Sequence, residues 1–421
     1  MLVVRYIEEN RDEVIRRLAT KGFQAEEIVG EALETDAQRK KLQTQADNLQ
    51  AEINSKSKEI GILMKSGQKD LAETLKQDIT TIKERAATLI NKQEAAEQKL
   101  KSLLIQLPNL PHNSVPHGKS AADNVIIRSG GVDPELPDDA LPHWDLAKKY
   151  DLIDFELGVK ITGAGFPVYK GNGARLQRAL ISFFLDRANE AGYQEVIPPL
   201  VVNEDSGFGT CNLPDKEGQM YHIGLDDFYL IPTAEVPVTN IYRDTILEAA
   251  DFPVKLTAYT PCFRREAGSY GKEVRGLNRL HQFDKVEIVR IEHPDRSYQA
   301  LDEMVAHVES LLQKLELPYR IVKLCGGDMS FASALTYDFE VYSAAQKMWL
   351  EVSSVSNFES FQANRLKLRY RDKKPQLAHT LNGSALALPR IVAALLENGQ
   401  KTNKIQLPEA LHPYTGFEYI I

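Results

Sequence analysis

The chain has 421 residues, of which 43% are hydrophobic and 26% are charged, a composition that excludes wholesale disorder. At about 150 residues per domain, the length argues against one compact domain. The 51 basic and 59 acidic side chains give a formal net charge of −8, which argues against a protein that coats DNA, another nucleic acid or an anionic membrane.

Cysteine usage and the first residues indicate the compartment. Cys211, Cys262 and Cys325 are too few and too scattered for a disulfide framework, and none belongs to a CxxC pair. The amino terminus becomes charged too early for a signal peptide, and no run of 18 apolar residues could span a bilayer. We therefore expect a cytoplasmic protein.

The first predicted elements are helical. Residues 10–19 have the apolar spacing of a short amphipathic helix, and residues 31–107 contain no proline and no aromatic residue. Apolar residues repeat every seven positions on both sides of a polar turn at residues 64–70, most strictly at Leu75, Ile82, Leu89, Ala96 and Leu103. This pattern predicts an antiparallel coiled-coil hairpin. A coiled coil is more often a dimerisation or scaffold device than an RNA-binding one, and both interpretations are open at this point.

After the hairpin, the composition and the hydrophobic pattern of the sequence change. Residues 108–125 form a proline-punctuated linker that cannot continue the helix, and residues 126–421 mix strand and helix patterns. Two apolar stripes predict helices at residues 176–191 and 301–315. Short strand-like runs predict strands at residues 228–231, 255–263, 282–291, 347–353 and 378–381. Strands outnumber the long crossover helices that a parallel sheet needs, so an α+β domain with a mainly antiparallel sheet is favoured.

The stretch from residue 257 to residue 287 contains most of the closely spaced charged and aromatic residues that could form a binding site. Two predicted strands flank a glycine-punctuated loop. Arg264 and Glu266 lie two positions apart and should share a face of the first strand, and Phe283 and Glu287 should share a face of the second. A guanidinium, a carboxylate and an aromatic ring could hold a phosphate, an amine and a base. A salt-bridged hairpin without a ligand fits these residues about equally well.

The same residues resemble a known family. Phe263-Arg-Arg-Glu266, a variable loop and His281-Gln-Phe283 resemble motif two of the class II aminoacyl-tRNA synthetases, and the wording from Gly268 to Gly276 resembles seryl-tRNA synthetases. Five further features match in the family's order. The hairpin resembles the tRNA-binding arm, residues 176–199 resemble motif one, and residues 233–235 resemble the serine loop. Residues 351–358 with 362–365 resemble the ATP-side strand, and residues 380–390 resemble motif three. Ala385 and Pro389 replace glycines that are common in motif three, and both still permit a strand, a turn and a helix.

The resemblance implies a two-step reaction and a set of roles. L-serine and ATP would give seryl-adenylate and pyrophosphate, and the seryl group would pass to the 3′ end of serine tRNA. The residues implied in catalysis are Arg264, Glu266 and Arg390. Those implied in serine binding are Thr233, Ala234, Glu235, Arg264, Glu287, Asn382 and Ser384. Those implied in ATP binding are Arg264, Arg265, Glu266, Val274, Arg275, Phe283, Glu351, Val352, Ser353, Ser354 and Arg390. Glu351 and Ser354 would hold Mg²⁺ with the ATP.

The resemblance also implies a domain organisation and partners. Residues 1–107 would be an N-terminal helical domain whose arm, from about residue 31, binds serine tRNA; residues 108–125 would be the linker, and 126–421 the class II catalytic domain. A homodimer is expected, selenocysteine tRNA is a further candidate substrate, and neither a membrane nor DNA is an expected partner. The alternatives are a synthetase-like amino acid ligase that loads a carrier protein and a catalytically silent RNA-binding coiled-coil protein.

Overall fold

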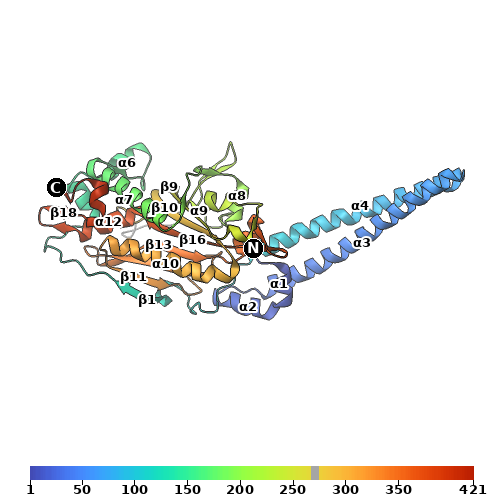
Figure 1. Ribbon diagram of the computed structural model, residues 1–421, viewed down its shortest axis with the longest axis horizontal. Coiled ribbons are helices and arrows are strands. Elements are labelled where there is room, and N and C mark those ends of the chain that lie inside the picture. Colours follow the sequence, from blue (N-terminus) through green and yellow to red (C-terminus); the bar gives the residue numbers. More distant parts are fainter. Residues whose placement is uncertain (267–274) are drawn as a thin grey trace. The chain divides into compact units, whose positions relative to one another are not determined.

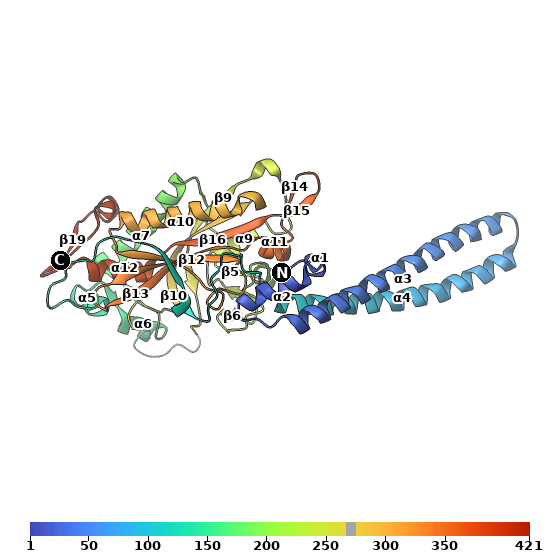
Figure 2. The ribbon, with the colours of Figure 1, turned by 90° about the horizontal axis from the view of Figure 1, so that it is seen from below.

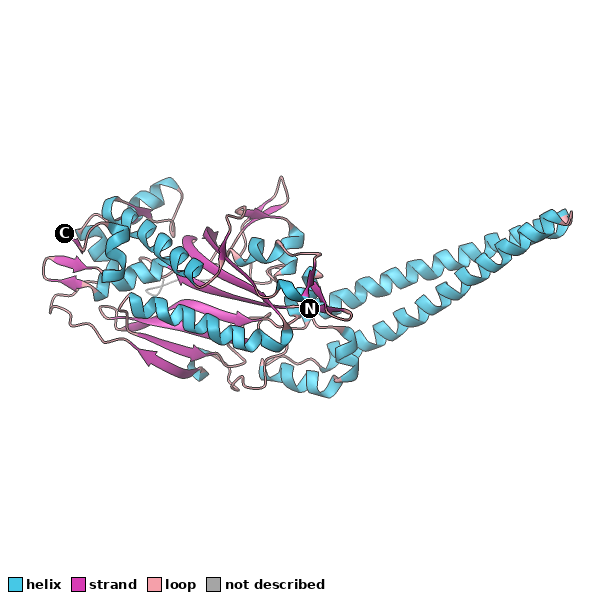
Figure 3. Ribbon diagram, in the orientation of Figure 1, coloured by secondary structure: helices cyan, strands magenta, loops and turns pink. Residues whose placement is uncertain are grey.

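The computed structural model describes residues 1–266 and 275–421, and the chain divides into two compact units. One unit comprises residues 1–19 and 23–108, and the other comprises residues 20–22 and 109–421. The first unit is helical, whereas the strands gather in the second (Figure 3). None of the helices in the described parts of the chain has the length and apolar character needed to cross a membrane.

The first unit contains the predicted hairpin. Its helices are α1 (Val4–Glu9), α2 (Arg11–Thr20), α3 (Glu26–Lys65) and α4 (Lys69–Gln106) (Figure 1). Ile53 of α3 packs against Ile79, Ile82 and Ala86 of α4, so the heptad repeat forms a buried seam between the two long helices. The helix α3 begins before the predicted start at residue 31. The turn between the legs is shorter than predicted and contains Gly67, whose φ of +77° suits a residue without a side chain.

The second unit is organised around one eight-stranded sheet. Its strand order is β1-β11-β12-β13-β16-β10-β9-β4, and all neighbours are antiparallel except β4 and β9. The bounds are β1 (Val125–Gly130), β11 (Tyr319–Lys323), β12 (Leu335–Ser343), β13 (Met348–Asn357), β16 (His379–Ala387), β10 (Gln282–Glu292), β9 (Val254–Phe263) and β4 (Gln194–Glu195). The mainly antiparallel α+β fold predicted from the sequence is confirmed (Figure 2).

The two faces of this sheet differ in chemistry. On β10, Val286 and Ile288 join the apolar core, whereas Lys285 and Glu287 point to the opposite face. The core is completed by three long helices, α7 (Gly171–Glu190), α10 (Ser297–Lys314) and α12 (Leu388–Asn398). The helices cover one face of the sheet, so the other face is available for polar side chains.

Short elements surround the sheet. The remaining helices are α5 (His143–Lys149), α6 (Phe155–Ile161), α8 (Glu204–Gly209), α9 (Glu235–Asn240), α11 (Phe361–Leu366) and α13 (His412–Thr415). The remaining strands are β2 (Ile153–Asp154), β3 (Val168–Tyr169), β5 (Val201–Val202), β6 (His222–Ile223), β7 (Phe228–Leu230), β8 (Ile246–Glu248), β14 (Arg369–Arg371), β15 (Pro375–Leu377), β17 (Gln400–Lys401), β18 (Lys404–Gln406) and β19 (Tyr419–Ile420).

Most predicted long elements are present, with changed ends. The helices predicted at 176–191 and 301–315 are α7 and α10, and each begins earlier than predicted. The strand predicted at 378–381 continues to Ala387, because β10 pairs with β16 as far as Ala387, and β13 adds pairs at residues 381–383. The residues 362–365, expected on a strand, instead form most of the helix α11.

Candidate functional site

A cavity of about 530 Å³ lies on the polar face of the sheet. Most of the predicted site residues line it: Thr233, Glu235, Arg264, Glu266, Phe283, Glu287, Glu351, Val352, Ser353, Ser354, Asn382, Ser384 and Arg390. They come from the strands β10, β13 and β16, from the residues just after β9, from the start of α9 and the residues before it, and from the start of α12. Segments that are far apart in the sequence therefore meet at one concave site.

Glu287 lies at the floor of the cavity with its carboxylate held on two sides. The Thr233 hydroxyl donates to Glu287 Oε2 at 3.0 Å, and Lys285 Nζ lies 2.7 Å from the same oxygen. Glu287 and Lys285 are both buried, and a buried ion pair needs such additional hydrogen bonds to offset its desolvation. The arrangement fixes a negative charge where a small cation, such as an ammonium group, can be received.

Glu235 lies close enough to Glu287 for its pKa to respond to that charge. Burial, and then the nearby charge of Glu287, raise the pKa of Glu235 to about 7. Gln362 Nε2 donates to Glu235 Oε1 at 2.7 Å, and the Thr380 hydroxyl donates to Gln362 Oε1 at 2.7 Å. The amide of Gln362 is therefore oriented from both ends, and it orients Glu235 in turn.

Arg264 and Glu266 do not pair with each other, and the salt-bridged hairpin that was the open alternative is present through a different ion pair. The strand β9 ends at Phe263, so both residues lie just beyond it, and Glu266 has a left-handed φ of +49°. Glu266 pairs with Arg279 instead. The Arg264 guanidinium lies 5.3 Å from the centroid of the Phe283 ring, and its Nε donates to Pro232 O at 3.4 Å. A cation and an aromatic face thus meet at the cavity wall, as a phosphate and a base would require.

A β-bulge in β13 arranges the opposite wall. Ser353 pairs with Phe339 and Glu351 pairs with Glu340, so Val352 is an extra residue without a partner on β12. Glu351 and Ser354 are three positions apart and would lie on opposite faces of a regular strand, but the bulge brings them to the same face. Val352 and Ser353 are buried, and the Ser353 hydroxyl donates to Ser384 O at 2.5 Å.

Arg390 is held at the start of α12. Its Nη1 donates to Glu351 O at 2.6 Å, and its Nε donates to Asn278 O at 3.0 Å. Pro389 occupies the first turn of this helix, where a missing backbone N–H carries no penalty. The strand and the helix that begins near Arg390 are present as expected, but β16 leads directly into α12 and the expected turn between them is absent.

Three of the predicted residues that the structure describes lie elsewhere. Among the described residues, Ala234, Arg265 and Arg275 do not line the cavity. Ala234 is fully buried in a small apolar cluster, the Arg265 guanidinium lies 5.8 Å from the Tyr221 ring centroid, and that of Arg275 lies 4.7 Å from the Trp144 ring centroid. Val274 lies outside the described residues.

Sequence reasoning missed several polar residues of the site. Lys285 carried a signal, since it stands two positions before Glu287 on a predicted strand and must share its face. Gln362 and Thr380 begin two of the segments that resemble family motifs, but their link to Glu235 arises only in the tertiary fold. Arg279 and Asn278 were placed in the loop, with no indication that they contact Glu266 and Arg390.

Known proteins and protein families match this chain, and close relatives match it over its whole length. Residues 1–111 match the family described as the seryl-tRNA synthetase N-terminal domain, and residues 221–399 match the tRNA synthetase class II core domain for G, H, P, S and T. The serine–tRNA ligase of Salinibacter ruber is 52% identical over 100% of this chain and 99% of that protein, and the one from Trichlorobacter lovleyi is 48% identical over 99% and 98%.

Solved structures give the same result. The crystal structure of seryl-tRNA synthetase from Pyrococcus horikoshii complexed with ATP superposes with a TM-score of 0.93 at 34% identity, over 100% of this chain and 99% of that one. Because the match extends over the full length of both proteins, it includes the hairpin, the sheet and the cavity. The chain therefore belongs to the seryl-tRNA synthetases, the serine–tRNA ligase family of class II.

Proposed function

We propose that this cavity activates L-serine with ATP, and that the chain then transfers the seryl group from seryl-adenylate to the 3′ end of serine tRNA. The observation that carries the proposal is the convergence of a buried carboxylate, Glu287, with two guanidinium groups, Arg264 and Arg390, in one cavity. The family membership and the ATP bound in the solved relative support it. Activation of this kind requires positioning and charge stabilisation more than a nucleophilic side chain.

We assign the serine subsite to the floor of the cavity. Glu287 and Thr233 would receive the ammonium group and the hydroxyl of serine, with Glu235, Asn382 and Ser384 completing the polar wall. An alanine molecule would leave these buried groups without a partner, and sites of this kind reject such an analogue by about 10⁴-fold. Ala234 would act by shaping the loop from within the adjoining apolar cluster.

We assign the ATP subsite to the two walls. Phe283 would stack on adenine, Glu266 would hold its edge, and Arg264 would clamp the α-phosphate beside the serine carboxylate. One carboxylate oxygen of serine would then attack the α-phosphorus, and the bond from that phosphorus to the pyrophosphate oxygen would break. Arg390 would neutralise charge at the far end of the triphosphate, as the planar guanidinium suits bidentate phosphate contacts. Arg265 and Arg275 would contribute from outside the cavity walls, and the backbone of Val352 and Ser353 would bound the site.

The residues that we assign to Mg²⁺ fit a hard cation. Glu351 and Ser354 lie on one face of β13, and Asp338 is paired with Ser354 on the adjacent strand β12. Asp338 Oδ1 is buried and has no hydrogen-bond partner among the described residues, and burial together with the charge of Glu351 raises the pKa of Asp338. Mg²⁺ commonly binds through one or two carboxylates and the substrate phosphates. When bound with ATP at Glu351 and Ser354, it would neutralise phosphate charge.

The helical domain, residues 1–107, is proposed to bind serine tRNA through α3 and α4, and residues 126–421 are proposed as the catalytic domain, with 108–125 as the linker. The N-terminal match over residues 1–111 disfavours a ligase that loads a carrier protein, since such an enzyme is expected to lack a full arm. A homodimer, charging of selenocysteine tRNA and a cytoplasmic location are part of the same proposal. Cys211, Cys262 and Cys325 are free cysteines.

Two assays test the function. Serine-dependent exchange of pyrophosphate into ATP measures activation, and charging of serine tRNA measures transfer. We expect exchange with serine to exceed exchange with alanine by about 10⁴-fold. No exchange with serine, or equal exchange with alanine, would contradict the proposal.

Two adjacent arginines provide a matched pair of variants. Arg264 lines the cavity, whereas Arg265 lies outside it against Tyr221. We expect Arg264→Ala to lose about 10²- to 10³-fold in exchange while remaining folded, since loss of one preorganised donor costs about that much. The same change at Arg265 should cost less than about tenfold. If both variants lose activity equally, Arg264 does not hold the role assigned to it.

A further inference from the structure

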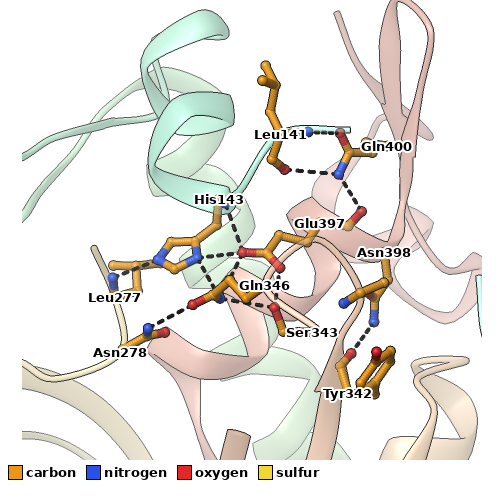
Figure 4. Close-up of polar contacts among 11 residues, drawn as sticks. Leu141, His143, Leu277, Asn278, Tyr342, Ser343, Gln346, Glu397, Asn398 and Gln400 are labelled. Atoms are coloured by element: carbon orange, nitrogen blue, oxygen red, sulfur yellow. Dashed lines mark hydrogen bonds and ion pairs between the residues drawn. The ribbon is translucent and has the colours of Figure 1, made fainter. Parts of the chain in front are cut away.

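The last turn of α12 contains a buried carboxylate that the proposed reaction does not use. Glu397 is fully buried and accepts hydrogen bonds from the backbone N–H of His143 (2.9 Å), its Nδ1 (2.8 Å), Gln346 Nε2 (2.9 Å) and the Ser343 hydroxyl (Figure 4). Burial raises the pKa of Glu397, but the hydrogen bonds from His143 and Ser343 outweigh this effect, so the net shift is downward. Glu397 is therefore a fixed anion rather than a titrating group.

His143 extends this contact to the segment that follows the motif-two loop. Its Nδ1 faces the anion and donates, so Nε2 is the acceptor, and Leu277 N donates to it at 2.8 Å. Gly276 has a φ of +66°, and a Cβ placed there would lie 2.3 Å from His143 Nε2. The Arg275 guanidinium lies 4.7 Å from the ring centroid of Trp144. Residues 275–277 thus rest on the first two residues of α5.

Gln346 makes a second connection from the same carboxylate. Its Nε2 donates to Glu397, and its Oε1 accepts from Asn278 Nδ2 at 2.9 Å. The carbonyl oxygen of Asn278 in turn accepts from Arg390 Nε at 3.0 Å. The chain of contacts therefore starts at the end of α12 and returns to Arg390 at the start of the same helix.

Neighbouring contacts make Glu397 part of a rigid support. Gln400 Nε2 donates to Glu397 O and to Leu141 O, and Leu141 N donates to Gln400 Oε1. Asn398 Nδ2 donates to Tyr342 O at 2.8 Å. The end of α12 thereby holds both the segment that leads into α5 and the turn between β12 and β13 (Figure 4).

We propose that His143 and Gln346 are positioning residues for ATP, which fix residues 275–278 and, through the Asn278 carbonyl, aim Arg390 into the cavity. The inference rests on the proposed function, because Arg390 is there assigned to the far end of the triphosphate and Arg275 to a contribution from outside the cavity walls. Neither His143 nor Gln346 lines the cavity, so both act through other residues. A displacement of about 1 Å in a positioned group can cost up to about 100-fold in rate.

Two substitutions of His143 separate its two hydrogen bonds. An asparagine amide nitrogen occupies nearly the place of Nδ1, so His143→Asn keeps the donor to Glu397 and loses the acceptor for Leu277. A glutamine amide oxygen occupies nearly the place of Nε2, so His143→Gln keeps the acceptor and loses the donor. We expect His143→Asn to lose about 10- to 100-fold in kcat/KM for ATP in serine-dependent exchange, with the KM for serine changed less than about twofold. His143→Gln should lose less than about fivefold.

A purely structural role makes a different prediction. In that case the losses would follow the melting temperatures of the two variants, and the KM values for serine and ATP would rise together; either result would overturn the inference. Gln346→Met, at a half-buried position in a turn, provides a second variant if the His143 variants do not fold. It removes the amide that links Glu397 to Asn278, and we expect the same selective loss for ATP. An unchanged kcat/KM for ATP in this variant would also overturn the inference.

Fluorescence tests the positioning without the reaction. Trp144 is the single tryptophan in a Trp349→Phe background, since the chain has two. We expect acrylamide to quench Trp144 at least about twofold more strongly in His143→Asn than in His143→Gln, because loss of the Leu277 contact releases Arg275 from the indole. Equal quenching would overturn the inference. Absence of exchange in the unmodified protein would contradict the proposed function instead, and the quenching result would still decide the positioning.

Discussion

Glu235 links a single side chain of the cavity to the pH dependence of stability. Its pKa of about 7, above the ordinary 4.5, means that the folded protein holds this proton more tightly than the unfolded chain does. The resulting stabilisation is fully present below pH 4.5 and is lost as the pH rises through about 7. Glu235→Gln keeps an oxygen that can accept from Gln362 and has no ionisable group.

We therefore expect the free energy of unfolding of the unmodified protein, relative to Glu235→Gln, to fall by up to about 3 kcal/mol between pH 5 and pH 8. Urea titrations of both proteins at the two pH values measure this difference. A difference that stays constant with pH would show that Glu235 is already ionised in the folded protein at pH 5.

Lys285 holds the orientation of the carboxylate that we assign to serine. Lys285→Met removes its ammonium group from Glu287 and leaves a buried charge with one contact fewer. We expect the variant to lose about 3–5 kcal/mol of stability and to raise the KM for serine far more than the KM for ATP. The double variant with Glu287→Gln is the control, because it should regain stability without regaining use of serine. Parallel changes in both KM values would count against the serine subsite.

Residues whose neighbours are set by one strand could be predicted from the sequence, whereas residues whose contacts come from distant segments could not. The alternation of a strand puts Glu287 and Lys285 on one face, so a local pattern was sufficient for both, although only Glu287 was identified. Gln362 reaches Glu235 across 127 positions of the chain, and no local pattern encodes that contact. The motif-two residues Arg264 and Phe283 were identified by family resemblance, and the structure places both on the cavity wall.

At the scale of elements, the seam between α3 and α4 rests on a few buried positions. Ile82 is 6% exposed in the seam, whereas Ile90 on the same helix is 44% exposed. We expect Ile82→Ala to destabilise the hairpin by about 2–4 kcal/mol, and Ile90→Ala by less than about 0.5 kcal/mol. Thermal melts followed by circular dichroism at 222 nm should show an earlier helical transition for Ile82→Ala, with pyrophosphate exchange unchanged. Equal effects of the two substitutions would mean that the seam does not determine hairpin stability.

The local sequence pattern predicts the long helices but not the bulge in β13 or the short helix α11. The heptad repeat predicted both long helices because their partner faces obey the same period along nearly the whole length. The bulge at Val352 depends on the pairing of β13 with β12, and the sequence of β13 alone does not contain that register. The helix α11 stands where the family resemblance implied a strand, and its six residues are too few for periodicity to have corrected that expectation.

At the scale of the whole molecule, the net charge is unevenly distributed. The −8 divides into +1 for residues 31–107 and −9 for the remainder, so the hairpin is nearly neutral in an acidic chain. The acidic remainder nevertheless presents Arg264 and Arg390 to one cavity. An acidic chain without a broad basic surface can still bind a specific tRNA, because a few phosphate contacts are sufficient and each remains salt-sensitive.

The separation of the chain into two compact units allows a test of the proposed division of labour. Gln93 Nε2 donates to Gln43 Oε1 between the paired helices, which marks a point where α3 and α4 can be joined. Replacing residues 44–92 by a short glycine-rich turn removes the outer part of the hairpin and keeps the Asp36 ion pairs with Arg39 and Lys40. We expect pyrophosphate exchange to remain within about twofold, because the cavity belongs entirely to the other unit.

The same truncation should lower kcat/KM for charging of serine tRNA by about 100-fold or more, since the lost surface would supply phosphate contacts that fix the tRNA. A shortened hairpin that replaces only residues 62–71 is the control and should retain most charging if the contacts lie along the legs rather than at the tip. Parallel loss of exchange and charging would show that the hairpin supports the catalytic unit itself. Full charging by the truncated enzyme would mean that the tRNA is held by the catalytic unit, and that α3 and α4 serve another purpose.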